Sequence, residues 1–199
     1  RVQEAANPAE MALRLAIAGN IIDLGAKSDL QYQEIHESIQ QAASAPLHGD
    51  VQGFFEAAAR ARHIVYLTDN AGEVVFDKLL MKALGPDKIT AVVKGAPILN
   101  DATMVDAVAT GLTKHVQVID NDLAAPGTLL ETSSEAFKSV FHDADLIVAK
   151  GQGNYETLSH INRPIAFAMK VKCNIVATDS GYNVGDMVLL HDLPHSTST

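Results

Sequence analysis

Hydrophobic residues recur at steps of three and four positions through the first third of the chain, which is the spacing of one face of an α-helix. The first such pattern begins at Asn7-Pro8, where proline suits a first helical turn, and reaches Gly25, a residue typical of helix ends. The same spacing predicts two further helices, over 28–45 and 50–62. We therefore expect residues 1–62 to form a helical N-terminal portion.

From residue 63 onward, short unbroken apolar runs alternate with segments of helical spacing. Unbroken runs of this kind are typical of strands that are buried on both faces. They predict strands over 63–68, 89–93, 116–119, 146–149 and 174–177, with a last apolar run over 187–190. Helices are predicted over 72–84, 102–110, 133–141 and 163–171. The alternation indicates an α/β domain over 63–199 with three layers, α/β/α, around a mostly parallel, Rossmann-like sheet.

Polar residues directly follow the first predicted strand, and ligands bind at the carboxyl ends of the strands in open parallel sheets. Asp69 and Asn70 place a carboxylate beside an amide oxygen, and Gly72 lets the backbone approach a ligand closely. Oxygen ligands next to the start of a helix suit Mg²⁺ or Mn²⁺ bound to a phosphate. Either polar residue could equally cap the next helix, so this segment alone leaves both readings open.

The second predicted strand ends in a similar way. Lys94 places a positive charge at the strand end, and Asn100-Asp101 opens the next helix beyond a glycine-containing loop. Asp101 could complete an oxygen-ligand set with Asp69 and Asn70, leaving positions for water and substrate. Helix capping by Asn100 or Asp101 is again the alternative.

A third polar loop, Lys-Gly-Gln-Gly-Asn-Tyr-Glu at 150–156, follows the strand predicted over 146–149. It is rich in hydrogen-bond donors, but it matches neither the P-loop nor the dinucleotide-binding spacing. A single glycine loop is weak support for a phosphate site. Three polar loops at predicted strand ends are harder to explain as helix caps, and together they predict a site for a metal ion and a phosphorylated ligand.

Charge and composition narrow the classes of function. The chain has 15 Lys+Arg against 24 Asp+Glu, a net charge of −9 without any basic block, which argues against a nucleic-acid surface. An anionic substrate stays compatible with this charge, because a divalent ion reverses the local sign of a pocket. The single cysteine, Cys173, excludes an internal disulfide and a cysteine-based zinc cage, and we interpret it as a core residue of a strand.

No apolar stretch reaches the roughly 20 residues that a membrane span needs, and no signal-peptide pattern is present. We therefore expect a cytoplasmic enzyme with no membrane partner. The chain starts at Arg1 and runs straight into a helical pattern, so we expect it to be truncated at its start. The sequence leaves the oligomeric state open.

The polar loops are similar to those of the damage-control phosphatases. The resemblance rests on Asp-Asn-Ala-Gly-Glu at 69–73 with Phe-Asp at 76–77, on Lys-Gly-x-Pro-Ile-x-Asn-Asp-Ala-Thr at 94–103, and on the loop at 150–156. This former family of unknown function includes the phosphatase domain attached to some eukaryotic pantothenate kinases. Its stand-alone prokaryotic branch is the nearest match, and Ala-Gly-Asn-Ile-Ile-Asp at 18–23 fits its helical part. That branch usually carries a Cys-x-x-Cys near its N-terminus, which this chain lacks.

The resemblance implies a three-layer α/β fold with a helical N-terminal portion, and a divalent metal (Mg, Mn, Co or Ni) held by Asp69, Asn70 and Asp101. It also implies that Lys172 contacts the phosphate, with a solvated charge at a strand edge as the alternative. We predict Asp69, Asp101 and Lys172 to be catalytic. The residues predicted to bind substrate are Asn70, Glu73, Lys150, Gln152, Gly153, Asn154, Tyr155, Glu156 and Lys172. We also predict residues that contact the metal ligands without binding the metal themselves, namely Asn20, Asp23 and Asn100.

The predicted reaction is metal-dependent hydrolysis of phosphomonoesters of small metabolites, such as sugar phosphates and phosphopantetheine-like or damaged phosphometabolites. We favour direct attack by water, because the sequence has Asp69-Asn70 where aspartyl-phosphate enzymes usually show Asp-x-Asp. One alternative is a carboxyl methyltransferase that uses S-adenosylmethionine, but the ExGxGxG-type loop expected of it is absent. The other is a non-catalytic module that binds phosphometabolites or nucleotides.

Overall fold

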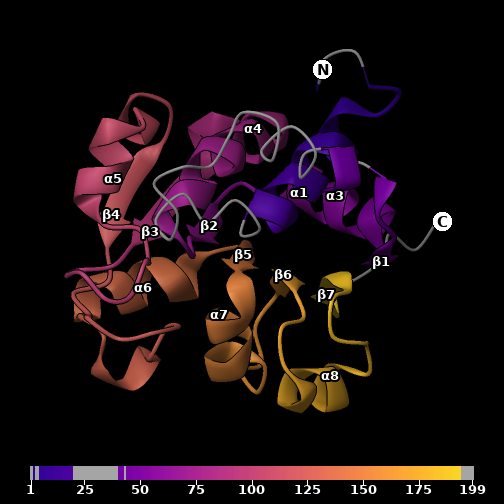
Figure 1. The fold of residues 1–199 in the computed structure, drawn as a ribbon. Coiled ribbons are helices and arrows are strands. Elements are labelled where there is room, and N and C mark those ends of the chain that lie inside the picture. Colours follow the sequence, from indigo (N-terminus) through magenta and orange to yellow (C-terminus); the bar gives the residue numbers. More distant parts are fainter. Residues whose placement is uncertain (1, 3–4, 20–39, 43, 194–199) are drawn as a thin grey trace, which may run out of the picture.

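The structure is a computed structural model, and it describes residues 2, 5–19, 40–42 and 44–193. In this part of the chain a seven-stranded sheet forms the middle layer, with strand order β1-β7-β6-β5-β2-β3-β4 (Figure 1). Neighbouring strands are parallel, except that β6 and β7 are antiparallel. The strands are β1 (Leu47–Gly49), β2 (Ile64–Leu67), β3 (Ile89–Val93), β4 (Gln117–Asp120), β5 (Leu146–Lys150), β6 (Ile165–Lys170) and β7 (Met187–His191). The predicted α/β class with a mostly parallel sheet is confirmed.

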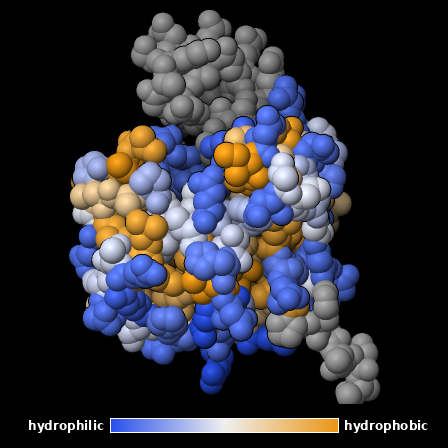
Figure 2. Space-filling model, turned by 90° about the horizontal axis from the view of Figure 1, so that it is seen from below, coloured by the Kyte–Doolittle hydropathy of each residue, from blue (hydrophilic) through white to orange (hydrophobic). Residues whose placement is uncertain are grey.

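Helices cover both faces of the sheet (Figure 1). One layer contains α1 (Pro8–Ala18), α3 (Val51–Arg60), α4 (Val74–Leu84) and α5 (Met104–Ala109), and the other α6 (Glu135–Asp143), α7 (Gly151–Leu158) and α8 (Asn174–Ser180). A hydrophobic core lies on each face of the sheet, and successive residues of the inner strands contribute to the two cores in turn. Ile64 of β2 faces the α1 and α4 side, and Val65 faces the α6 and α7 side. Figure 2 views the molecule from the α6–α8 side, where hydrophilic residues are interspersed with smaller hydrophobic areas.

Two elements near the C-terminus differ in type from the prediction. The segment predicted as a helix over 163–171 is the strand β6, and the segment predicted as a strand over 174–177 begins the helix α8. Pairing with β5 and β7 decides the conformation of β6, because a short apolar run does not by itself distinguish a buried strand from a buried helix. Cys173, predicted in a strand, is half-buried and directly precedes α8.

The segment before residue 63 contributes to both the sheet and the core. Its helix α1 packs against α4, and Asn7 caps α1 by accepting a hydrogen bond from the N–H of Glu10 at 3.2 Å. The strand β1, which sequence reasoning missed, pairs in parallel with β7 at the edge of the sheet. The domain boundary at residue 62 stays a prediction. Within the described residues, every helix is too short or too polar to cross a lipid bilayer.

Asp145 ties the start of β5 to the start of β2, and this contact predicts a pH-dependent stability. Its Oδ2 accepts hydrogen bonds from the backbone N–H groups of Arg62 (2.8 Å) and His63 (3.1 Å), which hold the pKa of the Asp145 carboxyl below its usual value. A carboxyl with a lowered folded-state pKa adds stability above its unfolded pKa of about 4, and this stability is lost as the pH falls through the folded pKa. We expect Asp145→Asn to lower the melting temperature at neutral pH, with the gap to wild type closing in acid.

Thermal melts across this pH range test the expectation. Asp143→Asn is the matched control, because the hydrogen bond that Asp143 forms with a described residue comes from the Ser139 hydroxyl of its own helix, at 3.4 Å. A melting-temperature gap for Asp145→Asn that stayed constant from neutral to acid pH would contradict the assignment.

Candidate active site

The carboxyl ends of β3, β2, β5 and β6 lie side by side along one edge of the sheet. The chain proceeds from β2 through β3 to β4 on one side, and then returns to place β5 on the other side of β2. Loops leave such a switch point in opposite directions and open a crevice for a ligand. The predicted site segments 69–73, 94–103 and 150–156 leave three of these strands, and Lys172 follows the fourth. The fold therefore brings together segments that are far apart in the sequence.

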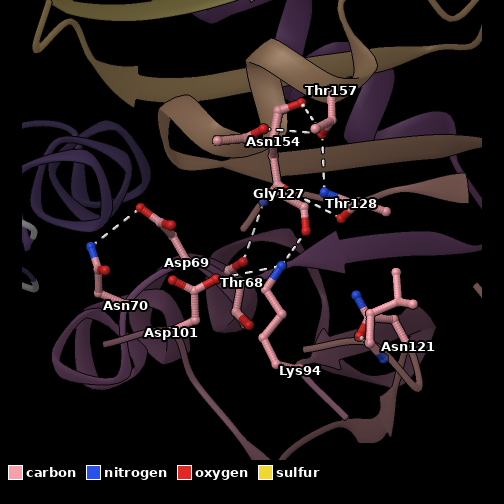
Figure 3. A network of polar contacts seen from close by, with 12 residues as sticks. Thr68, Asp69, Asn70, Lys94, Asp101, Asn121, Gly127, Thr128, Asn154 and Thr157 are labelled. Carbon is pink, nitrogen blue, oxygen red and sulfur yellow. Dashed lines mark hydrogen bonds and ion pairs between the residues drawn. The ribbon is translucent and has the colours of Figure 1, made fainter. Parts of the chain in front are cut away.

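Asp69, Asn70 and Asp101 meet where β2 and β3 end (Figure 3). A backbone bridge joins Asn70 to Asp101, and the N–H of Ala102 donates to the carbonyl of Asp69 at 2.8 Å. These backbone contacts fix the two loops against each other. Two carboxylates and one amide are therefore held next to one another at the strand ends.

Helix capping does not account for Asn70 or Asp101. Asn70 precedes a short 3-10 turn, Ala71–Glu73, but its side chain makes no capping hydrogen bond there. The helix α5 is capped by Thr103, whose N–H and hydroxyl donate to Asp106 Oδ2 at 2.9 and 2.7 Å. The alternative reading of these polar residues as helix caps is therefore not supported by the geometry.

Burial disfavours the charged forms of the two carboxyls. It raises the pKa of Asp69 to about 7, and Glu73 adds to this rise while Lys150 opposes it. Burial also raises the pKa of Asp101, against the effect of Lys94, whose Nζ lies 3.4 Å from Asp101 Oδ2. The same burial lowers the pKa of Lys94. A divalent cation between these carboxyls would stabilise their ionised forms.

The donor atoms fit a hard divalent cation. Both side-chain hydrogen bonds that Asn70 makes with described residues use Nδ2, so they leave its amide oxygen Oδ1 for a ligand. Asp69, Asn70 and Asp101 together offer oxygen atoms, which Mg²⁺ and Mn²⁺ prefer. No three His, Cys, Asp or Glu side chains of the described ranges form a metal-binding group. A set of two carboxylates and one amide leaves several coordination positions to water and substrate, as Mg²⁺ requires.

A buried cluster of charged side chains, formed by Lys150, Glu73 and Asp77, contacts Asn70 through Glu73. Lys150 Nζ is 2.8 Å from Glu73 Oε2 and 2.7 Å from Asp77 Oδ1, and all three side chains are at most 2% exposed. The hydroxyl of Tyr66 also donates to Asp77 Oδ1, at 2.7 Å. Burial alone would lower the pKa of Lys150, but the carboxylates of Asp77 and Glu73 raise it above its usual value. The ammonium of Lys150 is thus occupied by protein carboxylates, and its contact with substrate stays a prediction.

Gln152 links the start of α7 to the end of β6. Its Oε1 accepts from the backbone N–H of Lys172 at 3.0 Å, and its Nε2 donates to Glu156 at 2.9 Å. The side chain of Lys172 is exposed, and its positive charge acts to lower the pKa values of Asp69 and Asp101. Lys172 therefore follows the carboxyl end of β6, whereas the sequence predicted that it precedes a strand; its contact with the phosphate stays a prediction.

Asn154 clamps three segments at the strand ends (Figure 3). Its Nδ2 donates to the carbonyls of Thr68 at 3.3 Å and Lys150 at 2.7 Å, and its Oδ1 accepts from the Thr128 hydroxyl at 2.7 Å. The side chain is buried, so its polar atoms are engaged by the protein. The geometry gives Asn154 a role in holding the loops, and its predicted contact with substrate stays a prediction.

The loop between β4 and α6 borders the site and was missed by sequence reasoning. Its Gly127 carbonyl accepts a hydrogen bond from the Lys94 ammonium (Figure 3). A Cβ atom at Gly127 would overlap the carbonyl of Gly153, so the loop lies directly against α7. The sequence signal was the run Asp-Asn-Asp at 120–122, which ends β4 with polar residues as in the other three loops.

Two further residues of the predicted site, Tyr155 and Asn100, belong to the described part of the chain. The hydroxyl of Tyr155 donates to Asp179 at 2.7 Å, on the α7 and α8 face of the sheet. The side chain of Asn100 is exposed. Asn20 and Asp23 lie outside the described residues, so their predicted supporting role stays a prediction.

Residues 1–188 match the family model described as the damage-control phosphatase ARMT1-like domain. The chain is 41% identical over 186 residues to an uncharacterised protein of Methanocaldococcus jannaschii, covering 87% of this chain and 60% of that protein. It is 38% identical over 193 residues to a damage-control phosphatase of Archaeoglobus fulgidus, covering 94% and 66%. The chain thus spans 60 to 66% of the length of these curated relatives.

A solved structure also resembles the fold. The crystal structure of a DUF89 family protein from Pyrococcus horikoshii superposes with a TM-score of 0.88 at 35% sequence identity. The match covers 96% of this chain and 68% of that one. The similarity therefore extends over the sheet, both helical layers and the loops at the strand ends.

Proposed function

Because the chain belongs to the damage-control phosphatase ARMT1-like domain family, we propose that it hydrolyses phosphomonoesters of small metabolites with a divalent metal ion, Mg²⁺, Mn²⁺, Co²⁺ or Ni²⁺. The observation that carries this proposal is the meeting of Asp69, Asn70 and Asp101 at adjacent strand ends, beside the start of α7. Carboxylate and amide oxygens suit the metal, and a helix N-terminus suits a phosphate. The substrate class is sugar phosphates and phosphopantetheine-like or damaged phosphometabolites.

The roles of the residues follow from their places. Asp69, Asn70 and Asp101 would hold a divalent ion, which would supply Lewis-acid polarisation of a phosphate oxygen. The exposed ammonium of Lys172 and the first N–H groups of α7, at Gly151–Gly153, bind the remaining phosphate oxygens and stabilise their charge in the transition state. Water attacks phosphorus while the bond to the alcohol oxygen of the substrate breaks. A carboxylate of the site accepts the proton of the water, and the departing oxygen takes up that proton and leaves as the alcohol.

Phosphate release from a panel of these substrates, with and without each metal, tests the proposal. We expect release only with metal, and a loss of at least about 100-fold in Asp101→Asn, which removes a charged ligand. Asp87→Asn is the control, because Asp87 is an exposed carboxylate in the turn before β3, at the opposite edge of the sheet. If no substrate turned over with any metal, the reading as a binding module would replace this proposal.

Gly151 provides a second prediction, because it allows α7 to begin directly against Asp69. Its φ is +78°, and a Cβ atom there would overlap the Asp69 carboxylate. Gly181 has a φ of +79°, but apart from its chain neighbours no atom of the described residues lies within 4 Å of such a Cβ. Both alanine substitutions therefore carry the same backbone strain, about 1 to 2 kcal/mol, but only Gly151→Ala displaces a metal ligand.

We expect Gly151→Ala to weaken Mn²⁺ binding and phosphate release by at least about tenfold, in the range found when a metal ligand is misplaced. Gly181→Ala should also lower the melting temperature, because it has the same backbone strain as Gly151→Ala. It should leave Mn²⁺ binding and phosphate release unchanged. Titration calorimetry and thermal melts measure the two effects separately. Equal losses of Mn²⁺ affinity in the two variants would show that the close approach of Gly151 to Asp69 does not matter.

A further inference from the structure

The carboxylate of Glu73 is shared between two different donors. Its Oε1 accepts from the amide nitrogen of Asn70 at 2.6 Å, and its Oε2 accepts from the ammonium of Lys150 at 2.8 Å. The side chains of Glu73 and Lys150 are at most 2% exposed. Both oxygens of one buried carboxylate are therefore engaged, one by an amide and the other by a charge.

The contact with Glu73 decides which end of the Asn70 amide faces which way. An asparagine amide carries a donor nitrogen and an acceptor oxygen, and rotation by 180° exchanges them. Nδ2 of Asn70 faces two carboxylates, Glu73 at 2.6 Å and Asp69 at 3.2 Å. The reversed amide would place its oxygen against both anions and lose both hydrogen bonds. The observed orientation leaves Oδ1 for a cation.

We infer that Glu73 is a positioning residue that orients the Asn70 amide for metal binding, in place of the substrate contact expected from the sequence. The inference rests on the proposed metal set. Lys150 fixes the Glu73 carboxylate in turn, because a buried ammonium requires its acceptor. Asp77 supplies a second negative charge to Lys150, and its side chain accepts hydrogen bonds from Lys150 and Tyr66.

Glu73→Gln separates the two roles of this carboxylate. A glutamine has one acceptor oxygen and one NH₂ group, whereas the two donors at this place require two acceptors. The buried ammonium of Lys150 takes the oxygen, so the NH₂ group faces Asn70, which turns its own oxygen toward it. This withdraws Oδ1 from the metal. We expect the Kd for Mn²⁺ to rise by about 10- to 100-fold, the range typical of residues that orient metal ligands.

A second substitution should restore binding. Asn70→Asp in the Glu73→Gln protein places a carboxylate at position 70, which accepts from the glutamine NH₂ with one oxygen and keeps the other for the metal. The double variant has the formal charge of wild type. We expect it to bind Mn²⁺ at least as tightly as Asn70→Asp alone, because position 70 has no amide left to turn and Glu73→Gln removes the like charge that faces the new carboxylate at position 70. A role of Glu73 only as the ion-pair partner of Lys150 would give no such rescue.

Asp77→Asn is the matched control for the buried charge. It removes a carboxylate that contacts Lys150 at 2.7 Å but keeps an acceptor oxygen for Lys150 and Tyr66. We expect it to lower the melting temperature and to leave the Kd for Mn²⁺ unchanged, which separates stability from amide orientation.

Titration calorimetry on the metal-free full chain measures all four variants. Wild-type affinity in Glu73→Gln, or a double variant as weak as Glu73→Gln, would overturn the inference while leaving the metal set in place. If Glu73→Gln failed to fold, the comparison of the double variant with Asn70→Asp carries the same test, and weaker binding in the double variant would overturn it. Wild-type protein that bound none of Mg²⁺, Mn²⁺, Co²⁺ or Ni²⁺ would overturn the proposed metal set and this inference together.

Discussion

Asp69→Asn is expected to reduce metal-dependent phosphate release by roughly 10²- to 10⁴-fold, because a bound metal ion contributes several kcal/mol to such a reaction. Asp69 lies at the end of β2, between the loop that carries Asp101 and the start of α7, so its carboxylate is central to the proposed metal set. Phosphate release with Mn²⁺, compared with Asp87→Asn, measures the loss. Activity within a few-fold of wild type would show that the metal ligands are misassigned.

The same substitution is expected to stabilise the metal-free protein at neutral and alkaline pH. Burial and Glu73 raise the pKa of Asp69 to about 7, above the unfolded value of about 4. The stability associated with the neutral carboxyl is fully present below the unfolded pKa and is lost as the pH rises through the folded pKa. Asparagine does not titrate, so the advantage of Asp69→Asn should grow between about pH 4 and pH 7 and then level off.

Thermal melts in the presence of a chelator measure this advantage. A substitution that lowers activity but raises stability indicates a native residue that serves ligand binding and reduces folding stability. An Asp69→Asn protein that melted below wild type at pH 8 would contradict the electrostatic account of the site.

Lys150→Met is expected to cost about 3 to 5 kcal/mol of folding free energy, because it leaves Glu73 and Asp77 as buried charges without their cation. The control is Lys138→Met, which removes an equally short contact, 2.7 Å to Glu135, at the surface of α6. Such an exposed pair is worth at most about 1 kcal/mol. Urea unfolding at neutral pH measures both losses.

A compensating variant distinguishes charge burial from loss of packing. Adding Glu73→Gln and Asp77→Asn to Lys150→Met removes the uncompensated carboxylates and should recover a large part of the stability. If the triple variant were no more stable than Lys150→Met alone, lost side-chain packing would be the main cause of the damage. Equal losses in Lys150→Met and Lys138→Met would contradict the assignment of a buried cluster.

The fold was predictable to the extent that burial leaves a signature in sequence. β2, β3 and β5 are buried along their whole length, so each appears as an unbroken apolar run. The same signature failed at β6, where neighbouring strands impose the conformation, and at β1, which is too short to form a pattern. Both strands are determined by pairing with partners that are distant in the sequence, and local residue spacing carries no information about such partners.

The positions of the candidate site residues in the fold were predictable where a residue directly follows a strand, as Asp69 and Asn70 do. The directions of the side chains in 150–156 were not predictable in the same way, because these residues open a helix and face several sides of it. Lys150 is instructive, since Leu146 and Val148 of the same strand point into the core beside α1 and α4. Alternation along the strand sends Lys150 to that same side of the sheet, where its ammonium contacts Glu73 and Asp77.

The pairing of β1 with β7 also bears on the order in which the protein can assemble during synthesis. His48 aligns with Val188, so most of the described chain lies between the two partners. β1 leaves the ribosome before the other described strands, but its hydrogen-bonding partner β7 emerges after all of them. Contacts this distant in sequence are slow to form, because closing a long loop costs entropy before any pairing is gained. The edge of the sheet formed by β1 is therefore completed only after β7 has left the ribosome.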